Sequence, residues 1–330
     1  MPAPQTAALA APAAPLLAPA APLPAPAAPV HTASTGTDAS RALLSPTTSP
    51  RPLTLWGSSS MSSQGGAEAT PLEIRIHDHL SLAAAPAVVH AFGVGATRSA
   101  HTLLMRGLDT PTLRVTGPAD ATTGAVPVTL EPALNPAGPL QIPGTCGDVA
   151  GTLDGSTGTW SFRPDDPVAP VADGVFSSSL AAIAQGSRQI LWMGKNNITD
   201  TAGVLHDTQR MWDAAEHPAH DTLVLGQWPT GQDPTGSATG TALALVNTEQ
   251  QRRYGDHFLD LASLLTTVEG LACPPLQGLR LGEQASARDA LAAGVVPEEL
   301  RAPDGIHLNG WGNLAVSWAI VDRLRELGWL

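Results

Sequence analysis

The chain has 330 residues, of which 14% are charged and 43% are hydrophobic, and its formal net charge at pH 7 is −12. This length allows one or two domains with a sizeable core. A strongly acidic chain with few lysines lacks the clustered Lys and Arg that displace counterions from nucleic acid, which argues against a nucleic-acid partner. The same charge opposes binding to an anionic membrane surface. Furthermore, no run of about 18 apolar residues predicts a membrane span.

Residues 1–50 are predicted to form a disordered, Ala/Pro-rich tail and linker. The first 30 residues hold nine prolines and no charge. Each proline removes a backbone donor and restricts the residue before it, so an extended conformation is expected here. A signal peptide needs a basic start and an unbroken apolar stretch. The first arginine is Arg41, and prolines interrupt the apolar residues before it. A conventional signal is therefore not predicted, and the compartment stays open, with an extracellular or surface-associated place as one option.

Ordered structure is predicted to begin at residues 52–56, a short apolar run bounded by turn residues that is typical of a buried strand. Similar runs and helical spacings then alternate along the chain. The expected strands are 52–56, 87–92, 189–193, 222–225 and 257–260. The expected helices are 68–80, 97–106, 176–184, 202–216, a stretch within 247–265, and a C-terminal helix that Asn309 could cap. This alternation predicts an α/β fold with a three-layer, doubly wound parallel sheet.

The pattern changes between residues 107 and 174, which are rich in Gly, Pro, Thr and Asp. Apolar residues recur there at every second position, as in Val126, Val128 and Leu130. Period two with turn residues between the runs indicates short β-strands. We therefore expect a small β-rich domain at 107–174, inserted into a main domain made of 51–106 and 175–330.

Four short segments carry the residues suited to chemistry. Three of them directly follow predicted strands: Gly57-Ser58-Ser59, Gly93-Val94-Gly95 and Gly194-Lys195-Asn196-Asn197. In a doubly wound sheet, functional residues gather at the carboxyl ends of the strands, so these segments should meet at one edge. The fourth segment, Asp304-Gly305-Ile306-His307, precedes the last predicted helix. A tight turn there would bring the carboxylate beside the imidazole, as a histidine base requires.

These segments resemble, in order and context, the four sequence blocks of the SGNH, or GDSL-type, hydrolase superfamily. The resemblance implies a flavodoxin-like three-layer fold and a serine esterase that needs no cofactor or metal. Its triad would be Ser59, His307 and Asp304, and its oxyanion hole would be formed by Ser59, Gly95 and Asn196. Two positions depart from the family pattern, since Ser58 and Asn197 stand where the blocks have aspartate. Neither aspartate belongs to the family's triad.

Several alternatives stay open at this point. The run Ser58-Ser59-Ser60 leaves the nucleophile ambiguous, although register with Gly57 favours Ser59. The preferred substrate is a small-molecule or glycan ester, in particular an acetyl group on a carbohydrate. An inactive hydrolase scaffold that binds glycans in a surface or virion assembly is one alternative, and an acyltransferase using the same serine is another. Cys146 and Cys273 are either paired or free, and the oligomeric state is open.

Overall fold

The computed structural model describes residues 51–62, 70–83, 85 and 87–330. The chain divides into two units, residues 1–47 and 48–330, and all described residues lie in the second. The predicted tail at 1–50 and the first residues of the predicted helix 68–80 therefore lie outside the described residues.

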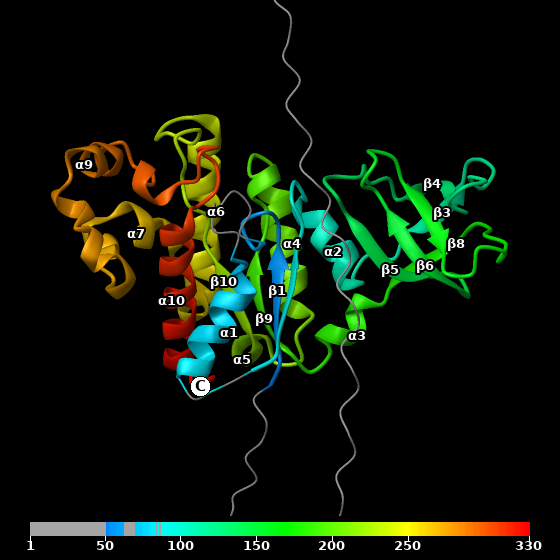
Figure 1. Cartoon of the computed structure of the whole chain (residues 1–330), viewed down its shortest axis with the longest axis horizontal. Coiled ribbons are helices and arrows are strands. Elements are labelled where there is room, and N and C mark those ends of the chain that lie inside the picture. The colour runs from blue at the N-terminus through cyan, green and yellow to red at the C-terminus, as the bar shows by residue number, and fades with distance from the viewer. Residues whose placement is uncertain (1–50, 63–69, 84, 86) are drawn as a thin grey trace, which may run out of the picture. The chain divides into compact units, whose positions relative to one another are not determined.

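Five parallel strands form the central sheet, in the order β11-β10-β9-β1-β2 (Figure 1). Their bounds are β1 Leu53–Gly57, β2 Val89–Gly93, β9 Arg188–Trp192, β10 Thr222–Leu225 and β11 Phe258–Leu259. All four neighbouring pairs run parallel. In chain order the strands are arranged 2-1-3-4-5, which is the flavodoxin-like doubly wound order. The predicted fold class is confirmed.

Ten α-helices are found in the described residues. Their bounds are α1 Leu72–Leu82, α2 Ser99–Arg106, α3 Leu180–Ala184, α4 Thr201–Asp213, α5 Pro218–Asp221, α6 Ala238–Tyr254, α7 Leu261–Thr266, α8 Val268–Leu271, α9 Ala285–Ala292 and α10 Gly310–Glu326. None of them is long and apolar enough to cross a membrane. Short 3₁₀ turns lie at Lys195–Asn197, Gly255–His257, Pro274–Leu279, Leu281–Glu283 and Glu298–Leu300.

The sheet is buried on both faces, because side chains along a strand point alternately to opposite sides. Leu55 and Ile190 pack into the core beneath α1, α7 and α10. Their neighbours Trp56 and Leu191 pack into a second core that includes α2. Figure 1 shows α1 and α10 on one side of the sheet and α2 and α4 on the other. A strand buried on both faces has a continuous apolar sequence, which is what made these strands recognisable.

Six antiparallel strands between α2 and α3 close into a small barrel, in the order β3-β4-β7-β6-β5-β8 (Figure 1). Their bounds are β3 Thr112–Val115, β4 Val126–Glu131, β5 Gln141–Cys146, β6 Val149–Asp154, β7 Ser161–Pro164 and β8 Gly174–Ser178. Side chains such as Leu113, Val128 and Phe162 are buried in it, and they belong to the same core as the α2 side of the sheet. The last strand of the barrel ends at Ser178, whose hydroxyl donates to the carbonyl of Met105 at 2.7 Å. The chain therefore enters and leaves the barrel at neighbouring points.

Two local predictions were wrong. Residues 176–178 are strand rather than helix, because β8 pairs with β3 and β5 and Phe176 is fully buried in the barrel. The helix expected within 247–265 begins earlier, at Ala238, where the Ser237 hydroxyl accepts the Gly240 N–H at 3.0 Å. That serine is an ordinary N-cap signal that the apolar pattern did not reveal.

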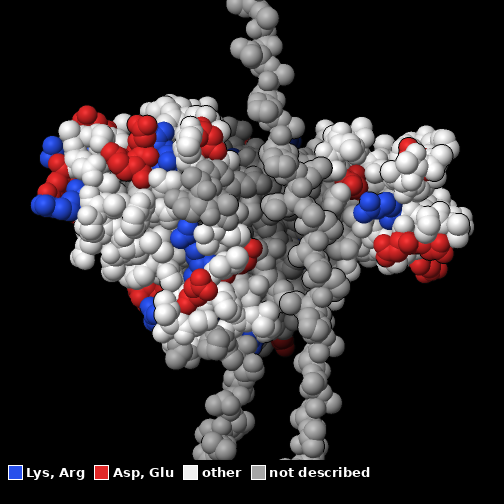
Figure 2. Space-filling model, in the orientation of Figure 1, with Lys and Arg blue, Asp and Glu red and all other residues white. Residues whose placement is uncertain are grey.

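Charged side chains are sparse on the surface. Figure 2 shows Lys, Arg, Asp and Glu in small groups on an otherwise uncharged face of the described residues. Cys146 and Cys273 are both buried and unpaired with each other.

Candidate active site

Ser59 lies in the tight turn that follows β1. The turn is closed by the Met61 N–H, which donates to the Ser58 carbonyl at 3.1 Å, and by the Ser62 hydroxyl, which donates to the Ser59 carbonyl at 2.9 Å. Gly57 is required where the turn begins, because a Cβ there would lie 2.3 Å from the carbonyl oxygen of Trp192. Ser58 is 3% exposed and Ser59 is 8% exposed.

A cavity of about 360 Å³ opens at the carboxyl ends of the strands. It is lined by Ser59, Ser60, Gly95, Ala96, Pro139, Lys195, Asn196, Trp228, Ile306 and His307. All four blocks singled out in the sequence therefore contribute to one cavity. Ser58 does not line it, so Ser59 and Ser60 are the hydroxyls that a ligand in this cavity would meet.

Asp304 and His307 form the acid–histidine pair expected from their spacing. The Asp304 carboxylate lies 2.7 Å from His307 Nδ1. It also accepts the backbone N–H groups of Ile306 at 2.8 Å and His307 at 2.9 Å. Partial desolvation opposes ionisation of Asp304, but these hydrogen bonds outweigh it and lower the pKa of Asp304 to about 2. An ionised carboxylate can only accept, so it holds the proton on Nδ1 and leaves Nε2 as an acceptor.

Three hydrogen-bond donors belong to residues that line the cavity. Within the described part of the chain, the backbone N–H groups of Ser59 and Gly95 have no hydrogen-bond partner. The side-chain amide of Asn196 donates one hydrogen to the Thr97 carbonyl at 2.8 Å. An amide has two such hydrogens, so the second is available to a ligand. In the same described part, Ser59 Oγ and His307 Nε2 also have no partner, so the two atoms line one cavity without a hydrogen bond between them.

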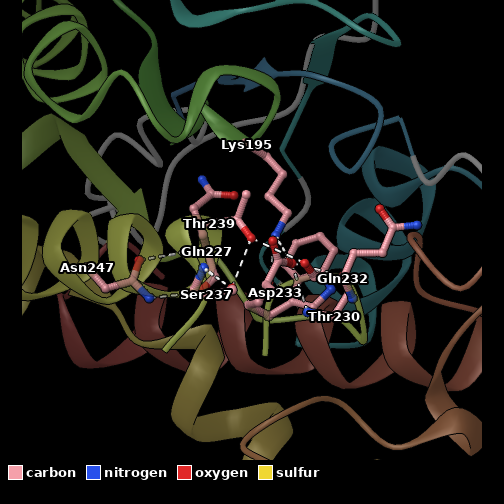
Figure 3. Close-up of polar contacts among 10 residues, drawn as sticks. Lys195, Gln227, Thr230, Gln232, Asp233, Ser237, Thr239 and Asn247 are labelled. Carbon is pink, nitrogen blue, oxygen red and sulfur yellow. Dashed lines mark hydrogen bonds and ion pairs between the residues drawn. The ribbon is translucent and has the colours of Figure 1, made fainter. Parts of the chain in front are cut away.

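A buried ion pair anchors the loop that carries Asn196. Lys195 Nζ lies 2.6 Å from Asp233 Oδ2 and donates to the Trp228 carbonyl at 3.2 Å. Asp233 also accepts the backbone N–H and the hydroxyl of Thr230. Figure 3 shows Lys195 reaching from its loop into this polar cluster around Asp233. Desolvation lowers the pKa of Lys195 and the hydrogen bond to Asp233 opposes that shift. The lysine that lines the cavity is thus already neutralised by a neighbour.

We expect Asp233→Asn to lower the free energy of unfolding by roughly 3–5 kcal/mol, since it leaves a buried ammonium without its counter-charge. The Lys195 and Asp233 side chains are only 16% and 7% exposed. The amide can still accept from Thr230, so the variant isolates the charge. Urea denaturation at pH 7 measures the change. Glu249→Ala, which removes the partly exposed pairs with Arg252 and Arg253, is the control and should cost less than about 1 kcal/mol. A loss as small as the control's for Asp233→Asn would contradict an anchoring role.

Solved structures with similar folds were found, whereas no family model and no curated protein matches the sequence. TesA is 12% identical, with 84% of this chain and 99% of that chain covered and a TM-score of 0.44. The psychrotrophic esterase EstA from Pseudoalteromonas sp., inhibited by monoethylphosphonate, is 8% identical over 84% and 97% of the two chains, with a TM-score of 0.45. A lipase/acylhydrolase from Enterococcus faecalis is 9% identical over 84% and 96%, with a TM-score of 0.42.

In the order and context of its four sequence blocks, the chain resembles the SGNH hydrolases. These TM-scores and identities are low, so the chemistry of the site has to be inferred from its own geometry. That geometry accommodates the two departures from the block pattern. Ser58 is buried behind the cavity. Asn197 turns away from the cavity to hydrogen-bond with Ser99 at the start of α2.

Five lining residues were given no role in the predicted site. Lys195 and Ile306 lie inside the predicted blocks and Ala96 directly follows one, so their place at the cavity followed from their neighbours. Pro139 and Trp228 lie outside the predicted blocks, in the β4–β5 loop and the loop after β10. Trp228 could be expected from its residue type either to line a sugar site or to pack in the core, and it is both buried and part of the cavity lining. A larger cavity of about 520 Å³, lined by Arg51, Arg106 and Ser187 among others, has no histidine or cysteine in its lining. It therefore offers no comparable nucleophile and base.

Proposed function

We propose that this chain is a serine ester hydrolase that works through an acyl-enzyme. The observation that carries the proposal is the cavity that Ser59 and His307 both line, with Asp304 hydrogen-bonded to His307 Nδ1, which leaves Nε2 as the unprotonated nitrogen. A nucleophile, a base and an orienting carboxylate are the parts that acyl transfer requires.

In the proposed reaction, Ser59 Oγ attacks the ester carbonyl while His307 Nε2 accepts its proton. Asp304, ionised at neutral pH, stabilises the imidazolium that forms. The N–H groups of Ser59 and Gly95 and the amide of Asn196 bind the oxyanion. His307 then returns the proton to the leaving alcohol. In the second half, His307 takes a proton from the water molecule that attacks the acyl group. His307 then returns this proton to Ser59 Oγ as the Oγ–acyl bond breaks and the carboxylic acid leaves.

The proposed substrate is a small acyl ester, preferably acetyl, on a carbohydrate. The size of the cavity, about 360 Å³, suits a small acyl group with part of its alcohol. Pro139 from the barrel lines the same cavity, so a group extending from the ester would meet the barrel. Lys195 is paired with Asp233, which favours neutral substrates over anionic ones.

The test is labelling with a fluorophosphonate followed by peptide mapping. We expect a single phosphonylated serine, Ser59, because only an activated serine attacks phosphorus at a useful rate. Adding p-nitrophenyl acetate in excess should slow the labelling. An unlabelled protein with no esterase activity would favour the inactive, glycan-binding scaffold. If the protein is labelled, and the acetyl group of p-nitrophenyl acetate passes to an added sugar rather than to water, the activity is that of an acyltransferase.

A further inference from the structure

The loop that carries Gly95 holds an unfavourable backbone conformation. Ala96 has φ of +62°, in the left-handed region that residues with a Cβ rarely adopt. The Thr97 hydroxyl donates to the Val94 carbonyl at 2.7 Å and closes the turn. Such a conformation persists only where the surrounding structure determines it, and it is common beside functional groups. The contacts that hold this loop therefore bear on where the Gly95 N–H points.

The barrel holds the loop from one side. Gly138, in the β4–β5 loop, packs so closely that a Cβ there would lie 1.8 Å from the Gly95 carbonyl oxygen. That β4–β5 loop is itself fixed, because the Asn135 carbonyl lies 2.8 Å from His101 Nε2 of α2. This contact limits movement of Gly95 toward the barrel. The other end of the loop, toward α2, has to be held by other contacts.

Asn197 holds the other end through Ser99, the first residue of α2. Its side-chain oxygen accepts the Ser99 N–H at 3.1 Å, and its amide donates to the Ser99 hydroxyl at 3.0 Å. Ser99 is fully buried. The neighbouring Asn196 donates to Thr97 within the same loop. The third sequence block is thereby joined to the second by three hydrogen bonds.

The contact with Asp207 of α4 fixes which groups of this network donate hydrogen bonds and which accept them. The Ser99 hydroxyl donates its one hydrogen to Asp207 Oδ2 at 2.5 Å. A hydroxyl has a single hydrogen, so Ser99 Oγ can then only accept from residue 197. An asparagine at 197 supplies that hydrogen. An aspartate would instead place a second carboxylate against the same oxygen.

We infer that Asn197 is a positioning residue of the oxyanion hole, and that Asp207 requires an amide at residue 197 in place of the aspartate of the family's block. This inference rests on the proposed function. Asn197 does not touch the substrate. It acts by holding Ser99, and through it the strained turn that presents the Gly95 N–H.

The electrostatics around Asp207 make this arrangement sensitive to charge. Burial raises the pKa of Asp207; the Ser99 hydrogen bond, His206 and Arg210 oppose this shift, and Asp109 adds to it. A raised pKa means that ionisation of Asp207 costs stability, so stability falls as pH rises through the folded pKa. A carboxylate at residue 197 would raise that pKa further, because two like charges would share Ser99.

The test is a cycle of four proteins: the wild type, Asn197→Asp, Asp207→Asn and the double variant. We expect Asn197→Asp to lower kcat for p-nitrophenyl acetate at pH 8 by roughly 10–100-fold with little change in KM, less than the 10²–10³ of losing a donor outright. Asp207→Asn alone keeps an oxygen that can accept from the Ser99 hydroxyl, so it should lower kcat by less than Asn197→Asp does. The double variant should recover, because the amide introduced at position 207 can donate to the Ser99 hydroxyl, which can then donate to the carboxylate introduced at position 197. Relative to wild type, the deficit of Asn197→Asp should shrink as pH is lowered.

Amide hydrogen exchange of residues 94–99, measured by mass spectrometry on the same four proteins, supplies a readout that needs no turnover. Faster exchange in Asn197→Asp, reversed in the double variant, supports the network. If the wild type neither hydrolyses nor labels, the proposed function fails and the exchange pattern still decides on the network. Equal exchange in all four proteins would overturn the network itself. Unequal exchange with an unchanged kcat in an active enzyme would overturn the positioning role.

Discussion

Replacing Ser59 with alanine is expected to lower kcat for p-nitrophenyl acetate by roughly 10⁴–10⁶-fold, as for removal of the nucleophile in other serine hydrolases. The variant should remain folded. Ser59 Oγ makes no hydrogen bond within the described residues, so its loss leaves no buried partner unsatisfied. We expect the free energy of unfolding to change by less than about 1 kcal/mol. Steady-state kinetics together with urea denaturation check both parts.

Ser60→Ala is the matched control, because Ser60 lines the same cavity and follows Ser59 directly. It should keep most of the activity and should still be labelled by a fluorophosphonate. The reverse outcome, with Ser60→Ala inactive and Ser59→Ala active, would move the nucleophile by one residue. It would leave the rest of the proposed site unchanged, since His307 lines the same cavity as both serines.

Much of the sheet could be predicted because its strands are buried on both faces. Leu53, Leu55 and Trp56 are at most 3% exposed. A strand buried on both faces needs apolar side chains at successive positions, so it can be recognised in the sequence as an unbroken apolar run. The carboxyl ends of parallel strands lie at one edge, so the position of the first three blocks followed from topology alone. The Asp304–His307 contact was predictable for a different reason, since both residues lie within one turn.

The partners of the site could not be predicted, because they are chosen by tertiary packing. Asp207 reaches Ser99 across 108 residues of sequence, and Asp233 reaches Lys195 across 38. A local pattern contains no information on which carboxylate will meet which donor. The misassigned residues 176–178 have the same cause. Phe176 lies just before the helical residues Leu180–Ala184, but the ladders of β8 with β3 and β5 fix it as strand.

The barrel and the loops that line the cavity are linked more closely than their positions in the sequence indicate. The β4–β5 loop packs Gly138 on Gly95 and contributes Pro139 to the cavity. Trp160 of the barrel holds this loop by donating to the Leu134 carbonyl at 2.6 Å. A separate domain at 107–174 remains a prediction. Whether or not the barrel folds independently, its loop forms part of the wall that a substrate would contact.

Asp304→Asn is expected to lower kcat/KM by roughly 10²–10⁴-fold while leaving the fold intact. The amide oxygen can still accept the N–H groups of Ile306 and His307, so the turn should persist. Its NH₂ group would face His307 Nδ1 and favour a proton on Nε2, which could then no longer accept from Ser59. The Asp304 side chain is 40% exposed, and rotation of the amide into solvent would place the effect in the lower part of the range.

The pH dependence separates this tautomer effect from a simple loss of charge. The pKa of Asp304 in the folded protein is lowered to about 2. The ionised carboxylate therefore stabilises the fold at every pH above the ordinary pKa of an aspartate, and this contribution is lost as pH falls through about 2. Titration of Asp304 therefore adds no step to the wild-type profile between pH 5 and 9. In that range Asp304→Asn should be slower than wild type at every pH, whereas Asp289→Asn, which removes an exposed carboxylate on α9, should match wild type. Equal kcat/KM for Asp304→Asn and wild type across this range would mean that His307 is oriented by something other than Asp304, and the acid member of the proposed triad would have to be withdrawn.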